Sequence, residues 1–170
     1  RERQQRFLID GAREIHGALA AGVKFLRAFI CDELCLSNEC RSAVTQVGKS
    51  GSEIFYVAPH VFAKLSFGER DDGLVVVAET PRHSLEQLKL SPSPIVAVLE
   101  GIEKPGNLGA MLRSADAGGV DAVLVVDGHT DLYNPNTIRP SMGTVFRANV
   151  VEATSENAIR WLREQKLTIV

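Results

Sequence analysis

The chain alternates between two patterns of hydrophobic and polar residues. Short apolar runs, which suit buried strands, are separated by segments whose apolar residues recur every three or four positions, as along one face of a helix. In the first half, Asp10 is placed to cap a helix that carries Ala12, Ile15 and Leu19 on one stripe. The expected elements are strands at 7–9, 25–30, 54–57 and 74–78, and helices after Asp10, at 39–47 and at 59–65. This order predicts a compact βαβαβαβ unit.

The apolar runs of the second half are longer and richer in β-branched residues. Strands are expected at 95–99, 122–126, 145–151 and 167–170, and helices at 108–117, at 136–142 and from Thr154 or Ser155 onward. Continuous runs of this kind, separated by helices, predict a parallel sheet covered on both faces. The last run would leave an uncovered apolar edge, so we expect further chain to follow it. The alternative is a natural edge strand.

A short proline-rich segment divides the two halves. Ser91-Pro92-Ser93-Pro94 holds two prolines, which remove backbone donors and disfavour helix before them. We therefore expect an α/β protein with a small α/β/α domain at 1–90, a linker at 91–94 and a parallel-sheet domain at 95–170.

The composition is that of a soluble globular protein, with 45% hydrophobic and 24% charged residues, which argues against disordered and fibrous classes. No apolar run approaches the roughly 18 to 20 residues that cross a bilayer, so we expect a cytoplasmic protein without membrane contact. The three cysteines, Cys31, Cys35 and Cys40, lie in one stretch without a histidine. Reduced thiols are therefore expected, and a structural metal is not.

The formal net charge of −2 excludes a protein that holds nucleic acid by bulk electrostatics alone. Any RNA site must therefore be local. The densest group of cations lies near the N-terminus, and the alternative to a binding patch is an ordinary solvated face. The group consists of Arg1, Arg3, Arg6, Arg13, Lys24 and Arg27.

The segment with the most chemical content follows the strand at 95–99. It turns through Pro105-Gly106 and enters a helix at Asn107, so free backbone N–H groups and a positive dipole end face the crevice beyond the strand. Arg113 follows six residues later, from where an extended guanidinium could reach back toward the helix start. The turn is not the Gly-x-Gly-x-x-Gly of dinucleotide folds. On these residues alone, a tight turn with close helix packing and a surface ion pair explains the pattern equally well.

Three separated segments resemble the SpoU/TrmH (SPOUT) family of RNA 2′-O-ribose methyltransferases. Asn107-x-Gly109-x-x-x-Arg113 with the Ser114-Ala115-Asp116-Ala117 that follows looks like the first motif of that family. A second stretch is similar to the one that follows this motif, and a third resembles the opening of the family's substrate-binding domain. The second comprises Tyr133-Asn134-Pro135, Arg139, Ser141, Gly143 and Phe146-Arg147; the third is Phe7-Leu8-Ile9-Asp10-Gly11-x-Arg13-Glu14.

The resemblance implies that the first domain binds structured RNA, either tRNA or rRNA, and that the second transfers a methyl group from S-adenosylmethionine to a ribose 2′-hydroxyl. It implies Asn107 and Arg113 as catalytic residues, and the complete protein as a homodimer. It further implies RNA contacts by Arg13, Arg139, Ser141 and Arg147. The alternative is a non-catalytic RNA-binding protein of the same fold.

Two departures from the family pattern affect these expectations. Where members often carry a His-Pro-Gln-Gly type turn, this chain has Glu69-Arg70-Asp71-Asp72-Gly73. The family's Gly-x-Glu and Ser-Leu-Asn-Val motifs, which form the knot that holds the cofactor, should follow position 170. We therefore expect an incomplete SPOUT domain with no cofactor-binding residues of its own, and a chain that is inactive alone.

Overall fold

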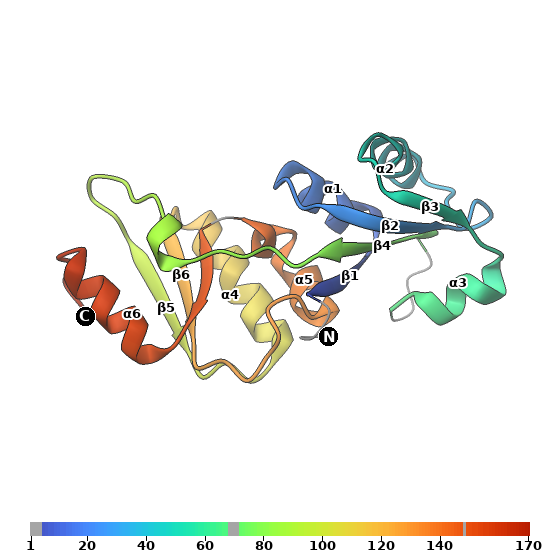
Figure 1. Cartoon of the computed structure of the whole chain (residues 1–170). Coiled ribbons are helices and arrows are strands. Elements are labelled where there is room, and N and C mark those ends of the chain that lie inside the picture. Colours follow the sequence, from blue (N-terminus) through green and yellow to red (C-terminus); the bar gives the residue numbers. More distant parts are fainter. Residues whose placement is uncertain (1–4, 68–71, 148) are drawn as a thin grey trace.

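The computed structural model describes residues 5–67, 72–147 and 149–170 and contains two sheets flanked by helices (Figure 1). The first sheet has the order β1-β4-β2-β3 and is mixed, because β4 runs antiparallel to both of its neighbours while β2 and β3 are parallel. Its strands are β1 (Arg6–Asp10), β2 (Phe25–Ile30), β3 (Glu53–Tyr56) and β4 (Leu74–Glu79), and its helices are α1 (Ala12–Ala20), α2 (Asn38–Lys49) and α3 (Pro59–Leu65). The predicted order of elements is confirmed.

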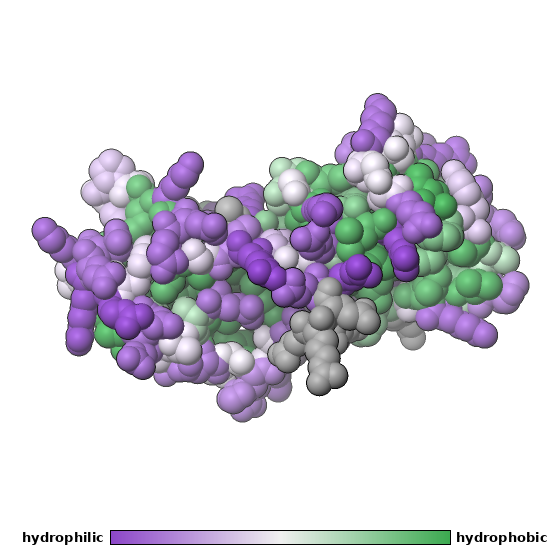
Figure 2. Space-filling model, in the orientation of Figure 1, coloured by the Kyte–Doolittle hydropathy of each residue, from purple (hydrophilic) through white to green (hydrophobic). Residues whose placement is uncertain are grey.

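Helices cover both faces of the first sheet, but unequally. The apolar stripes of α1 and α2 pack on one face against the inward residues of β1, β2 and β4. The seven-residue helix α3 contributes one fully buried side chain, Phe62, to the other face, where it meets Val75 and Cys31. Figure 2 shows apolar side chains over the part of the surface that this sheet occupies. Tyr56, the last residue of β3, is 67% exposed.

The second sheet is parallel, in the order β5-β6-β7, as the apolar runs predict. Helix α4 lies on one face and α6 on the other, with Leu112 and Trp161 packed against opposite sides of β6. Its elements are β5 (Val96–Glu100), α4 (Pro105–Ala117), β6 (Ala122–Val126), α5 (Pro135–Ser141), β7 (Val150–Ala153) and α6 (Ser155–Glu164), with short 3-10 turns η1 (Leu85–Gln87) and η2 (Thr144–Phe146).

Two of the expected strands of this half are wrong. The run at 145–151 begins as the turn η2, and its strand starts only at Val150. The run at 167–170 forms no strand, because Lys166 adopts a left-handed conformation (φ 58°) and the Leu167 N–H returns to the Leu162 carbonyl, 3.1 Å away. This arrangement ends α6 in a Schellman motif, and its apolar residue, Leu167, packs back on the helix.

Asp10 does not cap α1. Gly11 occupies the N-cap position without a side-chain bond, and the Asp10 carboxylate instead accepts a hydrogen bond from the Phe67 N–H at 2.6 Å. To cap α1, the Asp10 side chain would have to accept a hydrogen bond from the first turn of that helix. It accepts the hydrogen bond of Phe67 instead, which is far from it in the sequence.

The two halves share one hydrophobic core. The ring of Phe7 in β1 lies 4.8 Å from that of Tyr133 and 5.9 Å from that of Phe146, both in the second half. The backbones also meet closely, since a Cβ built on Gly17 of α1 would lie 3.3 Å from the Cα of Gly143. The segment 91–94 has no regular structure, and a domain boundary there stays a prediction.

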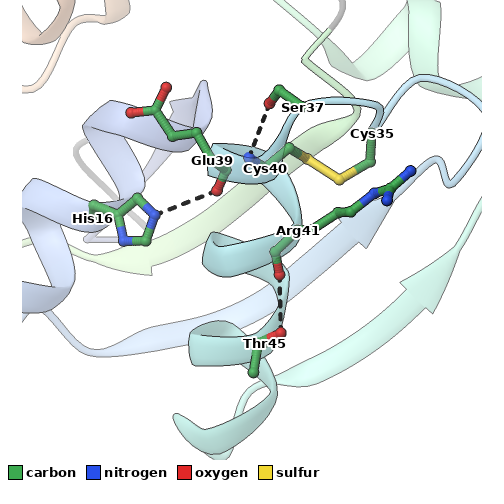
Figure 3. Close-up of a disulfide and its surroundings, with 7 residues drawn as sticks. All are labelled: His16, Cys35, Ser37, Glu39, Cys40, Arg41 and Thr45. Atoms are coloured by element: carbon green, nitrogen blue, oxygen red, sulfur yellow. Dashed lines mark hydrogen bonds between the residues drawn. A yellow bond between two sulfur atoms is a disulfide. The ribbon is translucent and has the colours of Figure 1, made fainter.

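The expectation of reduced thiols is contradicted, because Cys35 and Cys40 form a disulfide (Figure 3). Helix α2 begins between them, with Ser37 as N-cap accepting the Cys40 N–H at 3.0 Å, and this turn brings their Cα atoms to 5.5 Å. Cys31 is a free, buried cysteine. The expectation of reduced thiols rested on a cytoplasmic location and on the spacing of the cysteines. Neither shows where α2 starts, and the pairing of Cys35 with Cys40 depends on that start.

The disulfide predicts a measurable response to reductant. It closes a loop with a sequence separation of 5. Cross-linking a loop of this size restricts the unfolded chain and stabilises the fold by about 2 kcal/mol. Dithiothreitol should lower the free energy of unfolding, measured in urea, by that amount, whereas a C35A/C40A variant should not respond. An identical wild-type midpoint with and without reductant would contradict the prediction.

Within the described ranges no helix is long and apolar enough to cross a membrane.

Candidate functional site

The site predicted from the sequence lies where β5 leads into α4. The chain turns at Gly101 (φ 62°), and α4 begins at Pro105, with Lys104 as an N-cap that makes no side-chain bond. The helix therefore begins two residues earlier than expected, and Asn107 is its third residue rather than its first. Its side chain is exposed and makes no hydrogen bond to the part of the chain that the structure describes. The amide is free to donate and accept at the helix entrance.

Arg113 lies six residues further along α4, less than two turns, and is exposed. Its Nη1 is 4.0 Å from the thioether sulfur of Met142, so the guanidinium lies toward the end of α5 rather than toward the start of its own helix. No carboxylate of the described residues pairs with it, in contrast to the surface ion pair that the bare sequence left open. Its charge is thus available to an external anion.

Gly109 sets the distance between α4 and α5. A Cβ at this position would lie 2.3 Å from the Thr137 carbonyl oxygen and 3.0 Å from both Pro140 Cβ and Ser141 N. These are separations that real side chains do not reach, so only glycine permits this approach. The close packing that the glycine pattern allowed is therefore real, and it places the end of α5 beside Arg113.

Helix α5 is fixed at both ends by short-range polar bonds. Asn134 caps it by accepting the Asn136 N–H at 2.9 Å. Ser141 is fully buried, where its hydroxyl donates to the Ile138 carbonyl at 2.7 Å and accepts the Gly143 N–H at 3.3 Å. Met142 then takes a left-handed conformation (φ 53°). Ser141 thus acts as an internal brace, and its predicted RNA contact remains untested.

The predicted RNA-binding arginines are engaged within the molecule. Arg13 pairs with Glu14 at 2.8 Å, Arg147 pairs with Asp116, and Arg139 reaches Asp10 at 3.2 Å. Two cations of the expected N-terminal group are likewise paired, with Lys24 on Glu79 at 2.9 Å and Arg27 on Glu53 at 3.2 Å, while Arg1 and Arg3 fall outside the described residues. RNA binding by these side chains stays a prediction.

Asp10 is a buried acid near this site. Burial raises the pKa of its carboxyl, an effect that the Phe67 N–H and the Arg139 guanidinium offset only in part, and the neighbouring acids Asp72 and Glu14 add to it. The carboxyl holds its proton more tightly in the folded protein than in the unfolded chain. The free energy of unfolding therefore falls as the pH rises from 3.8 through the raised pKa of this group. Sequence reasoning missed this cluster, because its members become neighbours only in the folded chain.

Two family profiles match the chain. The SpoU rRNA Methylase family matches residues 94–170, and the MRM3-like substrate binding domain matches residues 1–76. Among curated relatives, a 23S rRNA (guanosine(2553)-2′-O)-methyltransferase of Bacillus subtilis is 26% identical over 99% of this chain and 63% of its own length. The mitochondrial rRNA methyltransferase 3 of Mus musculus is 29% identical over 95% of this chain and 37% of its own length.

Solved structures show the same fold. An RNA 2′-O ribose methyltransferase superposes with a TM-score of 0.80 at 39% identity, covering 98% of this chain and 62% of the other. The SpoU methyltransferase AviRb from Streptomyces viridochromogenes, in complex with AdoMet, gives a TM-score of 0.85 at 26% identity, again over 98% and 62% of the two chains. The chain thus spans less than two thirds of the length of these proteins.

Proposed function

Because the chain belongs to the SpoU methyltransferase family, we propose that it supplies the RNA-holding and hydroxyl-positioning part of an enzyme that methylates a ribose 2′-oxygen of ribosomal RNA. The observation that carries this proposal is the pair Asn107 and Arg113. Both side chains are exposed on α4. Among the described residues, Asn107 makes no side-chain hydrogen bond, and Arg113 contacts the Met142 sulfur but pairs with no carboxylate. Ribosomal RNA is proposed over tRNA because the relatives above are named for it.

The reaction class assigns different work to the two residues. The 2′-oxygen attacks a methyl carbon in line, the bond from that carbon to its leaving group breaks, and the hydroxyl proton is lost. Arg113 cannot take that proton, because an arginine guanidinium stays charged in proteins and can only donate hydrogen bonds. Its role is to hold a phosphate of the target nucleotide and to stabilise the developing alkoxide. Asn107 orients the ribose by donating and accepting hydrogen bonds.

We propose S-adenosylmethionine as the methyl donor; when bound, it supplies an electrophilic methyl group on a sulfonium. The described residues do not form a site for it alone. One groove of about 930 Å³ is lined mainly by aliphatic side chains, and its only charged residue is the cation Lys166. It also runs along α6, on the sheet face opposite α4. We infer that the donor site needs groups beyond those described.

The first domain is proposed to recognise folded RNA. Three of its cations, Arg13, Lys24 and Arg27, are paired with carboxylates, and the net charge of the chain is −2, which disfavours binding by net charge and favours recognition of shape through a limited number of phosphate contacts. Binding to RNA should then depend weakly on salt, with a slope that corresponds to few phosphate contacts.

The test is methyl transfer by the full-length protein. Purified enzyme, S-adenosylmethionine with a labelled methyl group, and separate ribosomal RNA and tRNA fractions are incubated together. We expect label in ribosomal RNA at a nucleotide whose 3′ phosphodiester resists alkali, because a methylated 2′-oxygen cannot attack it. Label on a base, or in tRNA alone, would overturn the proposed substrate. RNA binding without any transfer would support the non-catalytic alternative.

A further inference from the structure

One side chain of the second half reaches into the first. Arg139, on α5, places its Nη2 3.2 Å from Asp10 Oδ2 and 2.5 Å from the Phe67 carbonyl oxygen. The Phe67 N–H in turn donates to the same Asp10 oxygen at 2.6 Å. Three residues thus form a closed ring of hydrogen bonds that joins the end of β1, the segment after α3 and the helix α5.

Burial makes this ring costly to open. Asp10 is only 4% exposed, and its Oδ1 has no hydrogen-bond partner in the described part of the chain. Asp72 and Glu14 lie close enough to repel its charge, whereas Arg139 is the cation that neutralises it. A buried carboxylate that loses its one counter-ion among the described residues carries an uncompensated charge, which destabilises the fold more strongly than removal of the whole pair.

The ring is connected to the candidate site through α5. Gly109 seats α5 against α4, and Met142, three residues beyond Arg139, contacts the Arg113 guanidinium. The first half therefore contacts α5 at Arg139, in the last turn of the helix, and Met142, which directly follows that turn, contacts Arg113. The first half is the part proposed to hold RNA. A change in the angle between the two halves would therefore shift α5, and the Arg113 that it contacts, relative to the bound RNA.

We propose that Arg139 is a positioning residue, which through Asp10 and Phe67 sets the orientation in which RNA held by the first domain presents its ribose to Asn107 and Arg113. This inference rests on the proposed function. Under this proposal Arg139 does not contact RNA directly, since both of its hydrogen-bond partners, Asp10 and Phe67, belong to the protein itself.

The first measurement is a thermodynamic cycle that does not depend on activity. In the full-length protein, R139M should lower the free energy of unfolding, because Asp10 is left charged and unpaired. Adding D10N should restore most of the loss, because the amide removes that charge while its oxygen still accepts the Phe67 N–H. R27M, which removes an exposed ion pair within the first half, is the matched control and should change stability little. Additive effects of R139M and D10N would overturn the ionic coupling.

The second measurement separates positioning from folding. In the restored R139M/D10N protein we expect the Kd for RNA to stay within about twofold of wild type, while kcat falls by roughly a hundredfold, as for a misplaced reactant. R139K, which keeps the charge, should recover part of the rate. Full recovery of kcat in the double variant would reduce Arg139 to a structural residue. Weaker RNA binding with a smaller salt slope would instead show that Arg139 contacts phosphate, and would also overturn the proposal.

A distance measurement keeps the inference testable if the proposed function fails. Spin labels on unnatural amino acids at Lys49 and Glu164, both exposed and at the ends of α2 and α6, report the relation of the two halves. The distance distribution should be narrow in the wild type and in R27M, and broader in R139M/D10N. An unchanged distribution in the double variant would refute the positioning role whether or not the protein transfers methyl groups.

Discussion

Replacing Arg113 with alanine is expected to lower the rate of methyl transfer by roughly 10²- to 10³-fold, the usual effect of removing one preorganised donor from a developing oxyanion. The guanidinium is exposed, unpaired with any carboxylate of the described residues and held near Met142, so alanine removes an anion-binding group without opening a core. The fold should therefore keep its stability. S-adenosylmethionine affinity should stay nearly intact, because the donor contacts are proposed to lie elsewhere.

Single-turnover kinetics with the full-length protein, saturated with RNA, measure this effect on the chemical step. R113K should retain part of the activity, since lysine keeps the charge but cannot offer two parallel donors to a phosphate. Arg160 on α6, which contacts only Asn157 of its own helix among the described residues, provides a matched control as R160A. Wild-type turnover by R113A would exclude Arg113 from the reaction.

Elements governed by local periodicity could be predicted from the sequence, whereas contacts between distant segments could not. The strand Ala122–Val126 is buried along its whole length and was predicted with its observed bounds, because five consecutive apolar residues suit few other environments. The run at 167–170 looks similar but starts as a helix cap. The left-handed conformation of Lys166 decides between the two outcomes, and no hydrophobic pattern encodes it.

The candidate site divides in the same way. Asn107 and Arg113 could be found because their family motif is short and contiguous. The ring of Asp10, Phe67 and Arg139 joins residues 57 and 129 positions apart, so nothing in the local pattern marks it. Asp10 looks like a helix cap when it is judged by its neighbours in the chain alone. The resemblance that implies an RNA contact for Arg139 carries no sign of its bond to Asp10.

Gly109→Ala is the second change expected to have a large effect, and its sign depends on two opposing terms. Alanine favours helix over glycine by about 1 kcal/mol at an interior position. Against this, the new Cβ would lie 2.3 Å from the Thr137 carbonyl oxygen, which belongs to a helix backbone and cannot rotate away. Overpacking of this kind costs about 1–3 kcal/mol or more. The clash should prevail, so we expect a net loss of stability.

Gly106 tests this argument on the same helix. It has no atom within 4 Å of a built Cβ, so G106A should be neutral or stabilising by up to about 1 kcal/mol. Urea unfolding of both variants gives the comparison, and equal midpoints would contradict the packing role of Gly109. Relief of the clash requires α5 to move away from α4, which separates Met142 from Arg113. G109A should therefore also reduce methyl transfer under conditions where the variant remains folded, although residue 109 presents no functional group to RNA.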